Sequence, residues 1–357
     1  MHMADALISP VVGGTMWAAT AALTAYSSKK LKASMDDSKV PLMGVLGAFI
    51  FASQMINFTI PATGSSGHLG GGMILTILLG PYAAFLTMAS VLTVQALFFA
   101  DGGLLALGCN IVNLGFFPCF IAYPFIYKKI AGEQPTQRRI LAGAMVASIL
   151  GLQMGAFGVV LETLFSGISE LPFSTFVLMM QPIHLAIGIV EGFVTAAVVT
   201  FVWKARPETL EMVATAKPMG QFTLKNVIAG LLVVTAITGG ALSWFASANP
   251  DGLEWSMFHV SGKEELKAPE KGLHSMLGAL QEKTALLPDY SFAKAEEKEG
   301  HAKPGEGEAA ANSGKGKEEE WPNVSAGRSV SGLVGGAVTM VLAGLIGFGL
   351  RRFQRSR

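Results

Sequence analysis

The chain begins with Met1 and His2, which places an imidazole directly beside the α-amine. The amine, the main-chain nitrogen of His2 and its imidazole can close two fused chelate rings on one metal ion. A second imidazole would complete a square plane of nitrogen ligands, a geometry typical of Ni(II) or Cu(II) rather than Zn(II) or Mg(II). An α-amine has an ordinary pKa of about 8, so metal binding there would release protons and weaken as the pH falls.

His68 is the expected source of the second imidazole. It lies in the glycine-rich stretch SSGHLGGG (65–72), where glycine lets the backbone approach other groups closely. Three other histidines, for which a solvated surface position is expected, lie in a polar segment of the C-terminal half: His259, His274 and His301. The expected metal ligands are therefore Met1, His2 and His68.

Four polar residues in or beside apolar runs could support or gate such a site. Asp101, in FFADGGL, could attract cations or bond to ligand residues, although Asp-Gly-Gly is equally typical of a turn. Asn110 is expected to bond between helices rather than to a metal. Glu191 is an ionisable group inside a predicted span, which makes it a functional hypothesis, with His184 two turns earlier as its candidate partner.

The composition indicates a membrane protein. Of the 357 residues, 51% are hydrophobic and 14% are charged, and the mean hydropathy is +0.48, whereas a soluble domain has about 25% charged residues. Cys109 and Cys119 lie in an apolar run and are expected to be buried thiols rather than a disulfide or a metal pair. The sequence contains no nucleotide-binding motif, so any ATP hydrolysis would belong to another subunit, and no nucleic acid partner is expected.

Apolar runs long enough to cross a bilayer, which takes about 20 helical residues, recur along the chain. They cover residues 9–27, 40–58, 81–100, 104–127, 140–165, 183–203, 226–246 and 329–350. Basic clusters follow them at residues 29–32, 127–139, 203–208 and 351–357. Because positively charged loops face the cytoplasm, we predict a protein of the inner cell membrane with the N-terminus outside and the C-terminus in the cytoplasm.

The number of crossings adds a further span. Residues 29–32 and 127–139 are both predicted to be cytoplasmic, so an even number of crossings must separate them, and the long runs supply an odd number. The glycine-rich segment 65–80 is the only other apolar stretch there, and we expect it to be a short or broken helix. Irregular backbone at membrane depth is tolerated where protein surrounds it, and it often accompanies transporter binding sites.

The sequence thus predicts an all-α, polytopic membrane protein in two parts. Residues 1–205 would form a seven-helix bundle, and a cytoplasmic linker would follow at 206–220. Residues 221–357 would add two spans joined by a long external loop at 249–328. Within that loop, the charged, low-complexity stretch 294–320 is expected to be disordered.

A row of small residues marks one face of the second span. Gly44, Ala48 and Ala52 recur every four residues, a spacing that lets helices approach closely. This face could dock onto a membrane partner, or it could equally make a contact within the bundle.

Several stretches together resemble the CbiM/NikM family, the substrate-binding components of energy-coupling factor transporters for cobalt and nickel. They are MHMADALISP (1–10), ATGSSGHLGGG (62–72), the run at 78–113 and HLAIGIVEGFVTA (184–196). The C-terminal part resembles the small CbiN/NikN-type subunit of the same systems through NPDGLEW (249–255) and LLPDYSF (286–292). The chain therefore looks like a fusion of the two components.

The resemblance implies a metal site made by the amine of Met1, the main-chain nitrogen and imidazole of His2, and the imidazole of His68. It also implies a transported Ni(II) or Co(II) ion, a transmembrane coupling subunit and two cytoplasmic ATPase subunits as partners, and no enzymatic activity of the chain itself. Substrate-binding components of this class dock a small-residue face, like that of Gly44, Ala48 and Ala52, on the coupling subunit.

Two other classes of function are alternatives. A membrane-embedded metalloenzyme would need His68, His184 and Glu191 to converge on a metal, and the sequence has no HExxH motif to hold zinc. A membrane sensor would act through the external loop, whose low complexity and lack of cysteines argue against a folded module.

Overall fold

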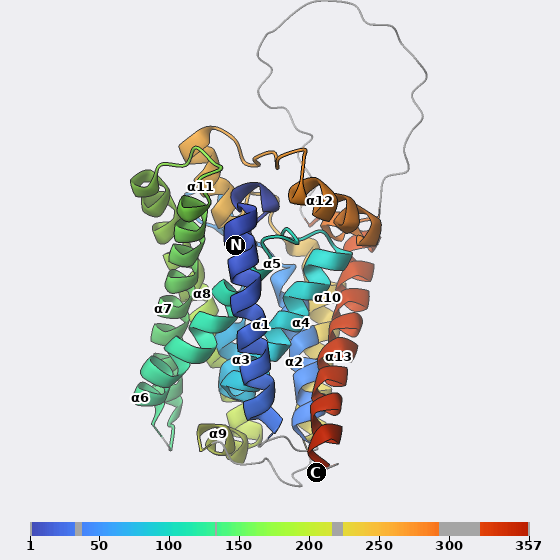
Figure 1. Cartoon of the computed structure of the whole chain (residues 1–357). Coiled ribbons are helices and arrows are strands. Elements are labelled where there is room, and N and C mark those ends of the chain that lie inside the picture. The colour runs from blue at the N-terminus through green and yellow to red at the C-terminus, as the bar shows by residue number, and fades with distance from the viewer. Residues whose placement is uncertain (1, 33–37, 133, 216–223, 293–321, 356–357) are drawn as a thin grey trace, which may run out of the picture.

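The computed structural model describes residues 2–32, 38–132, 134–215, 224–292 and 322–355. Met1, His301 and the stretch 294–320, about which the sequence made predictions, lie outside the described residues. Within them the chain is almost wholly helical (Figure 1).

The N-terminal part contains most of the helices. Their order is η1 (Asp5–Leu7), α1 (Pro10–Lys32), α2 (Lys39–Gln54), α3 (Gly72–Leu79), α4 (Pro81–Phe98), α5 (Leu107–Ile111), η2 (Val112–Tyr127), α6 (Lys128–Ala131), α7 (Gln137–Ser166) and α8 (Phe173–Ala205). A short antiparallel hairpin, β1 (Phe58–Ile60) and β2 (Ser65–Gly67), precedes α3. The segment η2 is a wide helix of the π type with two internal prolines, Pro118 and Pro124.

The predicted linker and the C-terminal part follow. Their elements are α9 (Pro207–Ala214), α10 (Lys225–Gly240), η3 (Leu242–Phe245), α11 (Gly252–Ser261), α12 (Leu273–Thr284), η4 (Pro288–Tyr290) and α13 (Ala326–Arg355). The predicted external loop is therefore folded over much of its described length, which corrects the expectation that it holds no folded module.

Five helical segments are long and apolar enough to cross a membrane. They are Pro81–Phe98, Leu107–Ala131, Gln137–Ser166, Phe173–Ala205 and Ala326–Arg352. Two shorter apolar helices, α2 and α10, lie among them. The protein is thus an all-α, polytopic membrane protein, as the sequence predicted.

The predicted short or broken span at 65–80 combines irregular chain with the short helix α3. This helix has eight residues, so at 1.5 Å per residue it is about 12 Å long, far less than the roughly 30 Å of a hydrocarbon core. All of residues 65–80 are buried, and α3 packs against α4, η2 and α9. The irregular residues before α3 therefore lie inside protein, where their polar backbone groups can be satisfied.

The C-terminal helix α13 packs along α2 and α10. A Cβ on Gly44 would lie 2.9 Å from the Met340 oxygen, and one on Gly336 would lie 3.7 Å from the Ala48 oxygen. Ala52, on the same predicted face of α2, is fully buried. The small-residue face of α2 therefore packs against α13 of the same chain, which agrees with the second alternative, a contact within the bundle.

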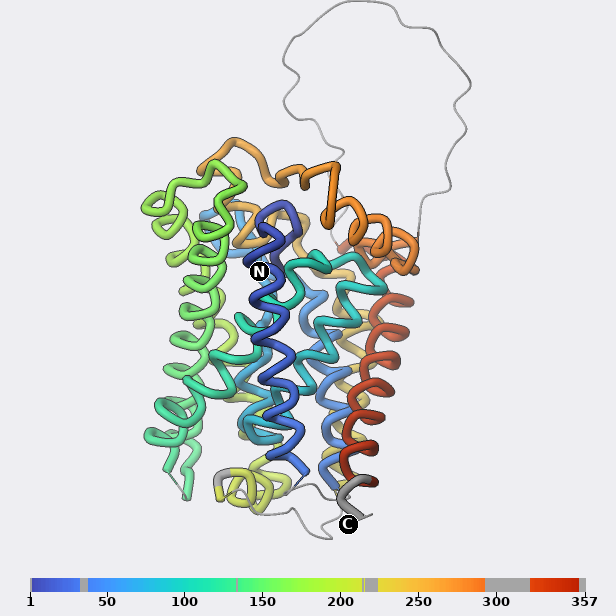
Figure 2. Tube along the Cα trace, in the orientation of Figure 1, coloured from blue at the N-terminus to red at the C-terminus, as the bar shows by residue number. Residues whose placement is uncertain are grey.

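The two ends of the bundle differ. Figures 1 and 2 show α11 and α12 at one end, where α1 begins, and α9 at the other, where α1 and α13 end. His274 in α12 donates a hydrogen bond to the Ile8 oxygen at 2.8 Å and is only 6% exposed. His274 is thus a buried contact between the two parts of the chain and not a solvated residue, whereas His259 is exposed as expected.

Candidate metal site

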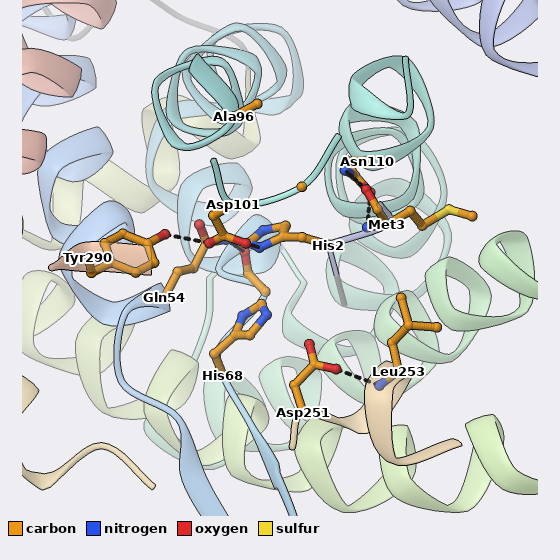
Figure 3. A network of polar contacts seen from close by, with 12 residues as sticks. His2, Met3, Gln54, His68, Ala96, Asp101, Asn110, Asp251, Leu253 and Tyr290 are labelled. Atoms are coloured by element: carbon orange, nitrogen blue, oxygen red, sulfur yellow. Dashed lines mark hydrogen bonds and ion pairs between the residues drawn. The ribbon is translucent and has the colours of Figure 1, made fainter. Parts of the chain in front are cut away.

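His2 and His68 lie against each other near the α11 end of the bundle. Their ring centroids are 4.9 Å apart and the ring planes differ by 22° (Figure 3). His2 comes from the N-terminal segment before η1, and His68 comes from the irregular chain between β2 and α3. The fold therefore brings together the two imidazoles that the sequence selected.

The contacts of His68 indicate which ring nitrogen carries a proton. Its side chain is buried. Its Nδ1 lies 3.1 Å from the Leu69 oxygen, and because a carbonyl only accepts, Nδ1 carries the proton. The lone pair that a metal requires is therefore on Nε2 of His68.

Asp101 fixes the ring of His2. Its Oδ1 accepts a hydrogen bond from His2 Nδ1 at 2.7 Å, and its Oδ2 accepts one from the Tyr290 hydroxyl. Burial alone would raise the pKa of the Asp101 carboxyl, but the neighbouring His2 and Tyr290 hold it below its usual range. The buried Nε2 of His2 has no hydrogen-bond partner among the described residues.

The residue after His2 is anchored by its backbone. Asn110 accepts a hydrogen bond from the Met3 nitrogen at 2.8 Å and donates one to the Met3 oxygen at 3.2 Å. The nitrogen of Gly103 also donates to that oxygen, at 2.9 Å. Gly102 allows this approach, since its φ is +81° and a Cβ would lie 2.9 Å from Asn110 Nδ2. Asn110 therefore holds the N-terminal segment in place. The sequence predicted a hydrogen bond between two helices, and the structure shows hydrogen bonds to the backbone of Met3 instead.

The irregular chain that carries His68 is held by Glu191. Its carboxylate accepts hydrogen bonds from the nitrogens of Gly70, at 2.9 Å, and Gly71, at 3.1 Å. These groups precede the N-terminus of α3, where a negative charge is favourable. His184, the candidate partner of Glu191, makes its own contact, because His184 Nδ1 donates to the Met180 oxygen at 2.7 Å.

His184 and His68 share a small cavity, with Gly67 and Gly70 among its other lining residues. The Nε2 of His184 is buried and has no hydrogen-bond partner among the described residues. Glu191 is not among the residues that line this cavity. Among the described residues, the three side chains of the metalloenzyme alternative therefore do not form one metal-holding cluster.

The motif PDGLE at 250–254 docks beside His68. Asp251 caps α11 by accepting from the nitrogens of Leu253, at 2.7 Å, and Glu254, at 3.0 Å. Glu254 Oε2 accepts from the Asp251 nitrogen at 2.9 Å, which completes a capping box. The Pro250 oxygen accepts from the Ser66 nitrogen at 2.8 Å. This places the Asp251 carboxylate next to the His68 ring (Figure 3).

Two residues of the site, Asp251 and Tyr290, were not selected from the sequence. The spacing of Asp251 and Glu254 is a recognisable capping box, so α11 could have been predicted, although not its place beside His68. No local signal links Tyr290 to Asp101, because 189 residues separate them.

A cavity of about 550 Å³ is lined by His2, His68, Asp101 and Asp251. Among the described residues, no three His, Cys, Asp or Glu side chains are arranged to hold a metal ion. A metal site here would therefore depend on backbone or terminal nitrogens beside the two imidazoles.

Comparison with known proteins identifies the class. Residues 2–209 match the family model of the cobalt uptake substrate-specific transmembrane region, and residues 225–352 match the PDGLE domain. The chain belongs to the first of these families, and it carries the second domain fused behind it. It is thus a transporter subunit and not an enzyme.

Some relatives match both parts of the chain, and others match only about the first 60% of it. The fused nickel transport protein NikMN of Rhodobacter capsulatus is 30% identical over 311 residues, covering 82% of this chain and 88% of that protein. The cobalt transport protein CbiM of Sorangium cellulosum is 27% identical over 223 residues, covering 59% of this chain and 95% of that protein. A crystal structure of a transition metal transporter matches with a TM-score of 0.51 and 30% identity, covering 57% of this chain and 93% of the other.

Proposed function

We propose that this chain is the substrate-binding membrane component of an energy-coupling factor importer that captures Ni(II) or Co(II) from outside the cell. The ligands would be the amine of Met1, the main-chain nitrogen and imidazole of His2, and the imidazole of His68. The observation that carries the proposal is the contact of the His2 and His68 rings, 4.9 Å apart, on the wall of a cavity. The metals named for the relatives, nickel and cobalt, agree with a nitrogen-rich site.

Chelation would change the bonding of His2. A chelate ring formed by a metal ion, the main-chain nitrogen of a histidine and its own imidazole closes through Nδ1. The other ring nitrogen, Nε2, lies on the far side of the imidazole and cannot reach the same ion. In this structure His2 Nδ1 is bonded to Asp101. Metal capture therefore requires the His2 ring to release Asp101, and the proton on Nδ1 would move to Nε2. The protons released on binding would come from the amine and the main-chain nitrogen.

Release into the cell would require other subunits. The sequence has no nucleotide-binding motif, so we propose that a transmembrane coupling subunit and two cytoplasmic ATPase subunits drive transport. Lysines in the last turns of α1 and α8 lie toward the α9 end of the bundle. This distribution supports an orientation with α9 in the cytoplasm and α11 and α12 outside.

The direct test inserts one alanine between Met1 and His2. The insertion keeps every side chain but turns the N-terminus into Met-Ala-His. Its amine, two main-chain nitrogens and the imidazole could then fill all four positions of a square plane, so the imidazole of His68 would no longer be a ligand. We expect uptake of both ions to disappear, and any Ni(II) binding that remains, measured by calorimetry on the purified chain, to be insensitive to a second change, His68→Ala.

A second variant, His68→Ala, removes one ligand and should weaken binding strongly. His259→Ala is the control, because His259 is exposed and distant in sequence from every proposed ligand. Unchanged uptake in the insertion variant, or residual binding there that still requires His68, would contradict the chelate model.

A further inference from the structure

The cavity over the two imidazoles has a strongly negative wall. Seven of the described residues that line it are Asp or Glu, and one, Arg328, is Lys or Arg. Asp5 and Asp101 belong to the N-terminal part. The remaining five belong to the C-terminal part: Asp251, Glu254, Glu264, Glu265 and Asp289.

These carboxylates extend from the surface to the imidazoles. Glu264, Glu265 and Asp289 are exposed, so the cavity reaches solvent at their positions. Glu254 is half-buried in the first turn of α11, and Asp251 lies next to the His68 ring (Figure 3). The negative charge thus follows a route inward from the surface.

In the segment between α11 and α12, acidic residues line the cavity and the basic residues beside them do not. The segment between α11 and α12 carries both lysines and glutamates, yet Glu264 and Glu265 line the cavity and their neighbours Lys263 and Lys267 do not. A solvated loop without a role in the cavity would not be expected to separate adjacent charges in this way.

A second observation points to a ligand in this cavity. The Nε2 of His2 is buried, has no hydrogen-bond partner among the described residues, and belongs to a side chain that lines the cavity. A buried polar atom without a protein partner requires water or another bound group. Water occupies roughly 30 Å³ per molecule in the liquid, so the cavity of about 550 Å³ can hold a cation with its first hydration shell.

We propose that the C-terminal part builds an anionic vestibule that gathers hydrated divalent cations from solution and delivers them to the His2–His68 pair. The inference rests on the proposed function, since it needs metal binding at that pair. A narrow cavity lined by one sign of charge raises the local concentration of counter-ions and their association rate. In this proposal the C-terminal part gathers cations in addition to covering the two imidazoles.

The test is the double variant Glu264→Gln/Glu265→Gln in the full chain, purified in detergent. Association and dissociation of Ni(II) are followed by stopped-flow quenching of tryptophan fluorescence. We expect association at low ionic strength to slow by about threefold or more, because steering depends on charge. The difference should shrink at 1 M salt, where charges are screened within about 3 Å, and the dissociation rate should not change.

The matched control is Glu270→Gln/Glu282→Gln, which removes the same charge from exposed positions of the same region that do not line the cavity. Association that is as fast in the first variant as in the wild type, or equally slowed in the control, would overturn the vestibule while leaving the metal site intact. A wild-type chain that binds no Ni(II) would instead overturn the proposed function and the vestibule together.

Discussion

At the scale of single residues, the site is held by hydrogen bonds from side chains that lie far away in the sequence. Asn110 fixes the backbone of Met3, Glu191 fixes Gly70 and Gly71, and the second carboxylate oxygen of Asp101 is held by Tyr290. None of these contacts needs a metal ion to form. They keep the two imidazoles together before capture, which reduces the ordering that binding must achieve.

Asn110→Ala tests the anchoring of the N-terminal segment. The variant removes two hydrogen bonds to Met3, each with a net contribution of about 1 kcal/mol. We expect the Kd for Ni(II), measured by calorimetry, to rise about tenfold or more, since 1.4 kcal/mol corresponds to a factor of ten. An unchanged Kd would show that the segment is positioned by other contacts.

Glu191→Gln tests the support of the His68 segment. The amide retains one acceptor but places a donor against a glycine nitrogen, so at least one of the two bonds is lost. Hydrogen bonds to a charged group contribute about 1.5–3 kcal/mol. We therefore expect a lower thermal midpoint in detergent and weaker Ni(II) binding, whereas the exposed Glu170→Gln should behave like the wild type.

At the scale of elements, α11 fits against α8 because its first residue is glycine. A Cβ on Gly252 would lie 2.8 Å from Ile183 Cγ2 and 3.1 Å from His184 Cε1. The capping box starts the helix at this point and fixes which residue faces α8. The motif thus sets both the start of α11 and its distance from the site.

Gly252→Ala should push α11 away from α8. Overpacking of this kind costs about 1–3 kcal/mol, so we expect a lower thermal midpoint and weaker protection of the hairpin β1–β2 against hydrogen exchange. Gly278→Ala in α12 is the control, because a Cβ there meets nothing within 4 Å and alanine favours the helix by about 1 kcal/mol. Equal behaviour of the two variants would contradict the close approach.

At the scale of the whole molecule, two family parts form one structure. The PDGLE-domain helices α10 and α13 pack on α2, α11 packs on α8, and α12 packs on α4. The proposed metal site lies where these two parts meet, since Asp251 and Tyr290 come from one part and His2 and His68 from the other. Fusion keeps both sides of this interface in one chain.

The interface should persist when the covalent link is cut. We expect residues 1–220 and 221–357, co-expressed as two chains, to copurify in detergent, since small residues let α2 and α13 pack closely. Gly335→Leu should abolish copurification, because a Cβ there would already lie 2.0 Å from Phe51 Cζ. Gly344→Leu, where nothing lies within 4 Å, is the control, and loss of copurification in both variants would refute the proposed specificity of the interface.

The sequence by itself determined the membrane class, and it singled out the irregular, buried segment 65–80 and the pair His2 and His68. Hydropathy and charge are properties of local segments, and chelation by the terminal residues is set by covalent geometry, so these predictions needed no packing. The sequence also supplied the capping box that begins α11.

The tertiary structure alone decided which distant groups meet. Glu191 binds the backbone of Gly70 and Gly71 instead of His184, and α13 covers the small-residue face of α2. The physical reason is that nearly every residue has a backbone N–H group and small residues are common. The sequence therefore does not show which of them a given side chain or helix will contact, and only the packed chain does. The carboxylates that line the cavity are likewise far apart in the sequence, and only the folded C-terminal part brings them together over the imidazoles.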